Sequence, residues 1–202
     1  MNHLLLIVCI SLISLTSCRK IDPSPTTAVD SGNFYRSGQL SSEELNKLIN
    51  LHGLRTVINL RGEHPGQKWF DDEFNLTESK QIHFISLDFE LKQIPHRRTL
   101  INYLDALATA PRPILIHCDN GVERTGEAAA IYQMVVQGKS KAEAMQMLSK
   151  KYYYSESDDP SKKYFIEQVW QNEIWARNSY NPCKDQYNHY PHSLSECVDQ
   201  NR

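Results

Sequence analysis

Short apolar runs alternate along this chain with segments in which apolar residues recur every three or four positions. The runs cover residues 54–60, 82–87 and 113–117, which is the length of a buried strand. Apolar residues recur at helical spacing in the segments that begin near residues 41, 95, 128, 140 and 161. Strands that alternate with helices predict an α/β domain with a central, mainly parallel sheet flanked by helices. Such a domain binds its ligand beyond the carboxyl ends of the strands.

Capping residues mark the ends of several expected helices. Ser41 and Glu44 form a capping box that opens one helix, and Gly53 is placed to end it. Ser140 and Glu143 form a second capping box. The last helix is expected over residues 161–176, and the polar, partly aromatic segment 66–80 connects two strands.

The start of the chain differs from the rest. Residues 4–15 are mostly apolar and carry no formal charge, but the run is too short to span a bilayer comfortably. It is typical of a signal peptide. The segment Leu15-Thr16-Ser17-Cys18 resembles the lipobox of bacterial lipoproteins, which implies cleavage before Cys18 and lipid attachment to it. We therefore expect an exported, lipid-anchored protein facing the periplasm or the cell exterior, with a buried N-terminal helix or an uncleaved anchor as the alternative.

These features predict four parts of the 202-residue chain: a signal peptide at 1–18, a flexible tether at 19–33, the main domain at 34–177 and a tail at 178–202. In an oxidising compartment, Cys183 and Cys197 of the tail are expected to pair, closing a loop worth about 3 kcal/mol. A metal site with His189 and His192 is the alternative, but its spacing matches no familiar zinc pattern, so no metal is expected.

Charge limits the possible partners. The chain has 22 Lys and Arg against 24 Asp and Glu, a formal net charge of -2, and no long run of one sign. This balance argues against a general nucleic-acid binder. Any site for a polyanion must therefore be local.

One segment carries a distinctive chemistry: His117-Cys118-Asp119-Asn120-Gly121-Val122-Glu123-Arg124-Thr125-Gly126. Cys118 follows a predicted strand and precedes a helix, so we expect a thiolate stabilised by the helix N-terminus. The five residues between Cys118 and Arg124 are enough to wrap backbone N–H groups around a phosphate, and Arg124 can hold two of its oxygens with a planar fork. Thr125 and His117 are expected in supporting roles.

The pattern His-Cys-x5-Arg-Thr-Gly resembles the signature of the protein tyrosine and dual-specificity phosphatases, including their atypical bacterial members. Segments 34–40, 56–63 and 113–117 extend the resemblance, which covers roughly residues 34–175. It implies a phosphoric monoester hydrolase without a cofactor, in which Cys118 takes the phosphoryl group and water releases it. The implied substrate is a phosphorylated protein or a small phosphomonoester.

A general acid must protonate the leaving oxygen. Asp88 stands thirty residues before Cys118 at the end of a predicted strand, similar to the acid aspartate of dual-specificity phosphatases. Glu90 and Glu123 are the alternatives. Arg61, after an apolar strand, is expected to help bind or position the acid loop, with a helix-capping salt bridge as the alternative.

The loop contains no lysine, which favours phosphotyrosine or another single phosphomonoester over highly phosphorylated inositols. An inositol phosphate phosphatase and a catalytically weak, phosphate-binding pseudophosphatase remain alternatives. A sulfurtransferase also uses a loop that starts with cysteine, but the closing Arg124-Thr125-Gly126 argues against it.

Overall fold

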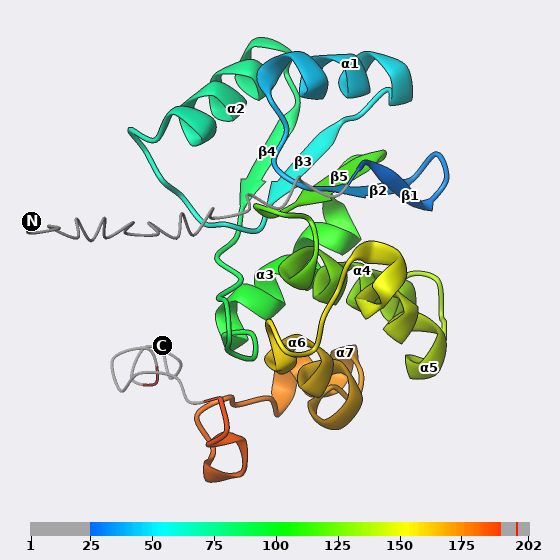
Figure 1. Cartoon of the computed structure of the whole chain (residues 1–202), viewed down its shortest axis with the longest axis vertical. Coiled ribbons are helices and arrows are strands. Elements are labelled where there is room, and N and C mark those ends of the chain that lie inside the picture. The colour runs from blue at the N-terminus through cyan, green and yellow to red at the C-terminus, as the bar shows by residue number, and fades with distance from the viewer. Residues whose placement is uncertain (1–24, 191–196, 198–202) are drawn as a thin grey trace, which may run out of the picture.

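The computed structural model describes residues 25–190 and Cys197, and it shows an α/β domain around a five-stranded sheet in the order β1-β2-β5-β3-β4 (Figure 1). Strands β2, β5, β3 and β4 are parallel, and β1 is an antiparallel edge strand. The predicted mainly parallel sheet is confirmed. The strands are β1 (Thr27–Asp30), β2 (Phe34–Ser37), β3 (Thr56–Asn59), β4 (His83–Ser86) and β5 (Ile114–His117).

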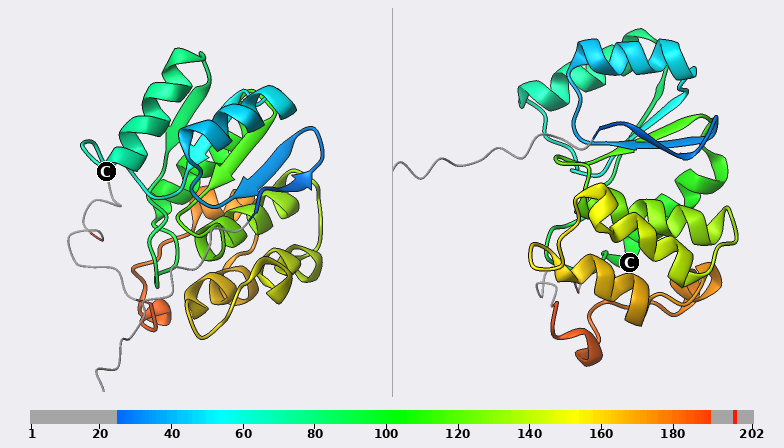
Figure 2. Two further views of the ribbon diagram at one scale, coloured as in Figure 1. Left: turned by 45° about the horizontal axis from the view of Figure 1, so that its top comes forward. Right: turned by 45° about the vertical axis from the view of Figure 1, so that its right-hand side comes forward.

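Helices cover both faces of the sheet. One face carries α1 (Ser42–His52) and α2 (Lys68–Ser79), and the other carries α3 (Arg97–Thr109) and α4 (Glu123–Val135), as Figures 1 and 2 show. Three short helices lie on the far side of α3 and α4: α5 (Lys141–Ala144), α6 (Pro160–Tyr164) and α7 (Glu173–Asn178). The 3₁₀ turns η1 (Met145–Leu148) and η2 (Lys150–Tyr152) link α5 to α6.

Alternating side chains of the central strands build a separate core on each face of the sheet. Val57 of β3 and Leu115 of β5 pack under α1, whereas Ile58 and Ile116 face α3 and α4. The middle of α4 is buried on every side, from Thr125 to Gln133. A helix enclosed in this way has little freedom to shift, so the residues at its start are held firmly.

The predicted helix caps are confirmed. Ser41 and Glu44 form the capping box of α1, and Gly53 ends that helix in the left-handed conformation. Ser140 and Glu143 form the capping box of α5. Both capping boxes and the glycine C-cap therefore lie at the residues where the sequence predicted them.

The predicted tether was wrong in its second half, because residues 27–30 form β1. Asn33 N donates to Asp30 O across a tight turn at 3.0 Å, and Gly32 takes a φ of 81° there. The Tyr35 hydroxyl accepts a hydrogen bond from Gly32 N at 3.1 Å. The turn therefore folds this segment back against β2. The predicted signal peptide and the first part of the tether lie outside the described residues.

Two further expectations were wrong. Segment 66–80 is no simple connection, because residues 68–79 form α2, whose Phe70 packs against Phe84 of β4. The single helix expected over 161–176 is interrupted: a π-helical turn, Phe165–Val169, follows α6, and Trp170 leaves the helical conformation. Asn172 then caps α7 by accepting from Trp175 N.

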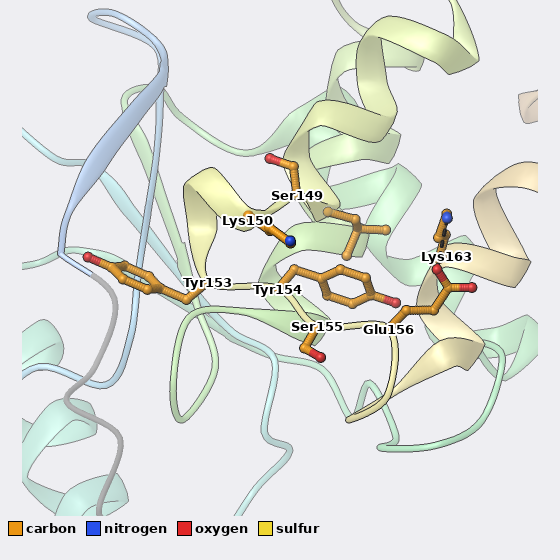
Figure 3. Close-up of a pocket in the computed structure, with 8 residues that line it drawn as sticks. Ser149, Lys150, Tyr153, Tyr154, Ser155, Glu156 and Lys163 are labelled. Carbon is orange, nitrogen blue, oxygen red and sulfur yellow. Dashed lines mark hydrogen bonds and ion pairs between the residues drawn. The ribbon is translucent and has the colours of Figure 1, made fainter.

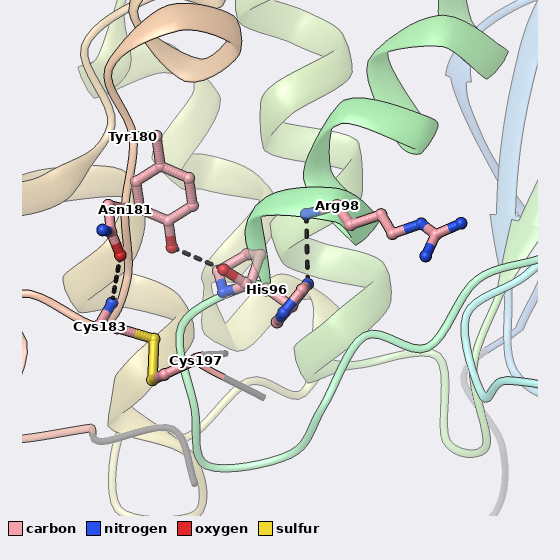
Figure 4. The surroundings of a disulfide bond; sticks show 7 residues. His96, Arg98, Tyr180, Asn181, Cys183 and Cys197 are labelled. Carbon is pink, nitrogen blue, oxygen red and sulfur yellow. Dashed lines mark hydrogen bonds between the residues drawn. A yellow bond between two sulfur atoms is a disulfide. The ribbon is translucent and has the colours of Figure 1, made fainter. Parts of the chain in front are cut away.

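The predicted disulfide between Cys183 and Cys197 is confirmed, with the two Cα atoms 5.8 Å apart (Figure 4). Nearby, the Tyr180 hydroxyl donates to Pro95 O at 2.6 Å, which ties the start of the tail to the loop before α3. His192 lies outside the described residues. Within the described part, no three His, Cys, Asp or Glu residues are grouped to hold a metal, and no helix is long and apolar enough to cross a membrane.

We predict that Gly126→Ala destabilises the protein. A Cβ at Gly126 would lie 2.8 Å from Met147 O and 2.6 Å from Leu148 Cδ2. Overpacking of this kind costs about 1–3 kcal/mol, which exceeds the gain of up to about 1 kcal/mol that alanine normally brings to a helix. Urea denaturation should show a lower midpoint. Ala108→Gly, on the exposed side of α3, measures the helix-propensity contribution alone; a stabilised Gly126→Ala would contradict the predicted clash.

Candidate active site

The loop that follows β5 surrounds the sulfur of Cys118. Gly121 N donates to Cys118 Sγ at 3.3 Å, and α4 begins at Glu123, the residue before Arg124. Cys118 is only 1% exposed. The sulfur therefore lies deep in the loop, at a helix N-terminus where backbone N–H groups favour an anion.

Gly121 is required by the way this loop packs. Its φ is 73°, and a Cβ there would lie 2.4 Å from Gly38 N and 2.5 Å from Ser37 C. Gln39 N donates to Asp119 O at 2.8 Å in the same contact. The loop is thus pressed against the chain that leaves β2, and only glycine fits at its closest point.

Arg36 supports the loop from beneath, a role that sequence reasoning missed. This fully buried residue of β2 donates from Nη2 to Gly121 O at 2.8 Å and Val122 O at 3.3 Å, and from Nη1 to Met147 O at 2.9 Å. Burial lowers the pKa of Arg36 to about 10, opposed by Tyr152, whose ring it overlies, and by Cys118. No strand was predicted around Arg36, and segment 34–40 only extended the family resemblance, so nothing in the sequence assigned this role to Arg36.

Arg124 and Thr125 occupy the first turn of α4. Arg124 Nη1 lies 3.4 Å from Leu60 O, at the end of the neighbouring strand. Arg124 Nε and Thr125 Oγ1 are buried and have no hydrogen-bond partner among the described residues. Buried donors without partners are costly, so both are suited to a ligand that brings oxygen acceptors or to the cysteine sulfur.

His117 contacts a buried carboxylate that sequence reasoning also missed. Its Nε2 lies 2.9 Å from Glu73 Oε1 of α2, and the two side chains are 1% and 3% exposed. Its Nδ1 lies 3.2 Å from Cys118 O. Contacts on both ring nitrogens fix the imidazole beside the loop. No pattern in the sequence distinguished Glu73 from the other acidic residues of 66–80.

Arg61 connects the loop to α2. Its Nη1 lies 3.2 Å from Asp119 Oδ1 and 2.8 Å from Gln39 Oε1, and its guanidinium carbon stacks 3.5 Å from the centre of the Trp69 ring. Partial burial lowers the pKa of Arg61, while Asp119 acts to raise it. The backbone of Arg61 also bridges to that of Asp88, so this residue touches both the Cys118–Arg124 loop and the loop after β4.

The three candidate acids lie on two elements. Asp88 is exposed and packs beside Gly62, whose added Cβ would be 3.2 Å from Asp88 Cγ. Glu90 is partly buried in the same loop. Glu123 opens α4, next to Arg124; burial raises the pKa of Glu123, and the nearby Asp159 adds to that rise.

Comparisons with known proteins agree with this geometry. Residues 16–167 match the family described as DSP-PTPase phosphatase fused to NAD+ kinase. The dual specificity protein phosphatase TpbA of Pseudomonas aeruginosa is 28% identical over 140 residues, which are 68% of this chain and 60% of TpbA. The chain therefore spans less than two thirds of that relative.

Two solved structures share the fold. P. aeruginosa TpbA in complex with pTyr matches with a TM-score of 0.57 and 22% identity, over 77% of this chain and 94% of that one. The core catalytic domain of the PP-IP phosphatase SIW14 from S. cerevisiae, in complex with citrate, matches with a TM-score of 0.61 and 22% identity. This match covers 76% of this chain and 90% of that one. The predicted superfamily and fold are confirmed, and the chain belongs to the DSP-PTPase phosphatase family.

Proposed function

We propose that the chain is an exported, lipid-anchored phosphatase that hydrolyses single phosphomonoesters, of phosphotyrosine or dual-specificity type, through a phosphocysteine on Cys118. One observation carries the proposal: the Cys118 sulfur accepts from Gly121 N inside a loop at the start of α4, and Arg124 follows on the first turn. A nucleophile and donors for phosphate oxygens thus share one small site.

The reaction has two steps. The Cys118 sulfur attacks phosphorus, the bond to the ester oxygen breaks, and that oxygen takes a proton from the general acid. Water then attacks the phosphocysteine, its proton returns to the same carboxylate, and the thiolate leaves with inorganic phosphate as the other product. The unpartnered hydroxyl of Thr125 stabilises the departing sulfur, and Arg124 binds the transferred oxygens in both steps.

Asp88 is the proposed acid. It follows β4 at the carboxyl edge of the sheet, and its backbone is held on both sides: Leu87 N donates to Asn59 O at 2.8 Å and Phe89 N to Leu60 O at 3.3 Å. Leu60 O also accepts from Arg124. The same carbonyl therefore links the Asp88 loop to the phosphate-binding arginine.

The burial of Cys118 and the charges around the loop favour a substrate that carries one phosphate on a projecting side chain. Because Cys118 is 1% exposed, the phosphate must enter the loop, and a phosphotyrosine side chain reaches further than phosphoserine. Around the loop, Asp119, Glu123 and Asp88 are acidic, and Arg61 is already paired with Asp119. A ring that carries several phosphates would need more free cations here.

Export is supported by the sequence before residue 19 and by the disulfide of the tail. Disulfides persist mainly in oxidising compartments, and Cys183 is paired with Cys197. The apolar run 4–15, followed by Cys18, provides a route to that compartment. Lipid on Cys18 would then hold the domain at a membrane surface.

We predict that the purified, reduced protein hydrolyses an aryl phosphate and that Cys118→Ser abolishes turnover. Arg124→Lys should lower kcat/KM by about a hundredfold or more, because a point charge cannot replace the planar fork that binds developing phosphate charge. Steady-state release of the phenol measures both effects. Turnover by Cys118→Ser equal to that of the unmodified chain would overturn the proposal; phosphopeptide binding without turnover would indicate a pseudophosphatase.

We predict that Asp88→Asn lowers kcat by about 10²–10⁴ and removes the decline in rate toward high pH. A general acid must carry its proton, so the rate falls as rising pH removes that proton, and asparagine has none to lose. Glu123→Gln is the matched variant. Because the pKa of Glu123 is raised, a decline at unusually high pH that disappears only in Glu123→Gln would assign the acid to Glu123 instead.

We predict that the mature protein begins at Cys18 and carries lipid there. Mass spectrometry of the protein extracted from membranes of the expressing bacterium should give an N-terminal peptide heavier than the sequence alone by the acyl groups. Cys18→Ala should leave the precursor unprocessed. An unmodified mature chain that starts at Met1 would contradict the lipoprotein assignment.

A further inference from the structure

Lys162 of α6 is a fully buried cation, which is rare because removing an ammonium group from water is costly. Its Nζ donates to two backbone carbonyls of the loop between β4 and α3: Glu90 O at 2.5 Å and Gln93 O at 2.6 Å. The two residues between them pass around the ammonium with their side chains exposed. The loop that begins at Asp88 is thus wrapped around a side chain from a distant helix.

The rest of the first turn of α6 binds the same loop. Asp159, the N-cap of α6, accepts from Lys92 N at 2.9 Å, and Ser161 Oγ donates to Gln93 O at 3.0 Å. Lys92 takes a φ of 59°, which is unfavourable for a lysine. The loop conformation is therefore stabilised from outside, by three residues of one helical turn.

Glu127 links this arrangement to the helix that carries Arg124. Its Oε2 lies 3.4 Å from Lys162 Nζ, and both side chains are fully buried. Burial raises the pKa of the Glu127 carboxyl to about 8, although the Lys162 ammonium acts in the opposite direction. The Glu127 carboxyl thus lies beside the Lys162 ammonium, about one turn beyond Arg124 on α4.

We propose that Lys162 is a positioning residue for general acid catalysis: with Asp159 and Ser161 it clamps loop 88–94 in the conformation that presents the acid to the leaving oxygen. This inference rests on the proposed function, because it assumes that loop 88–94 carries the acid. An apolar residue at 162 would fill the space, but it would leave two loop carbonyls and Glu127 without their cation.

Aryl phosphates with different leaving groups test the clamp. p-Nitrophenolate leaves readily without a proton, whereas phenolate needs one, so a displaced acid harms phenyl phosphate more. Lys162→Met should therefore lower kcat/KM for phenyl phosphate by about tenfold or more beyond any loss with p-nitrophenyl phosphate, within the range that general acids contribute. Equal losses on the two substrates, or none, would overturn the proposal.

Lys163→Met is the matched control. Lys163 is the next residue of α6, but it faces the surface, where its Nζ pairs with Glu156 Oε2 at 2.9 Å (Figure 3). This variant should leave both substrates unaffected. If Lys162→Met does not fold, Ser161→Ala, which removes the hydroxyl that contacts Gln93 O and the Asp159 carboxylate but keeps the Lys162 ammonium, should produce a smaller shift in the same direction.

Amide hydrogen exchange separates failure of the clamp from failure of the proposed function. Residues 88–94 should exchange faster in Lys162→Met than in Lys163→Met. If the unmodified chain shows no turnover that depends on Cys118, the proposed phosphatase reaction fails, and the exchange result still decides whether Lys162 holds the loop. Unchanged exchange over residues 88–94 would overturn the clamp even in an active enzyme.

Discussion

The loop from Cys118 to Arg124 depends on a cation that is buried beneath it, the guanidinium of Arg36. A loop whose N–H groups converge on an anion turns some carbonyls outward, and buried carbonyls need donors. Arg36 supplies them to Gly121 O and Val122 O, from a strand eighty-five residues away in sequence. The planar guanidinium of Arg36 is required here, because Nη1 donates to Met147 O while Nη2 donates to the two loop carbonyls. Position 36 therefore stabilises the shape of the loop while Arg124 remains available to the ligand.

Parallel strand order brings the remaining groups to this loop. The carboxyl ends of β2, β3, β4 and β5 meet at one edge of the sheet, so the chain after each of them contributes to the same small region. The carbonyl of Leu60, just after β3, accepts from Phe89 N of one loop and from Arg124 of another. The sheet thus brings together residues that are far apart in the sequence, such as Leu60, Phe89 and Arg124.

Features that depend on neighbouring residues could be predicted from the sequence, and features that depend on distant ones could not. The loop from Cys118 to Arg124, the capping boxes and the disulfide each rest on short spacings. Glu73 was missed because only its contact with His117, forty-four residues away in the sequence, distinguishes it from other acidic residues. Helix α2 was missed because its buried face combines Phe70 with the polar side chains of Glu73 and Thr77. Strand β1 was missed because it is a short edge strand. Its pairing with β2 determines its conformation, and its own sequence has no apolar pattern typical of a strand.

Gly126, the last residue of segment 117–126, packs against the same group of residues that surrounds Arg36. At Gly126, α4 approaches η1 so closely that a Cβ would lie 2.8 Å from Met147 O. That carbonyl is also the one that accepts from Arg36 Nη1. A larger residue at 126 would push Met147 away and remove one of the acceptors that orient the guanidinium. Gly126 thus acts on the Cys118–Arg124 loop through Arg36. The glycine and the arginine of β2 are therefore two parts of one packing constraint.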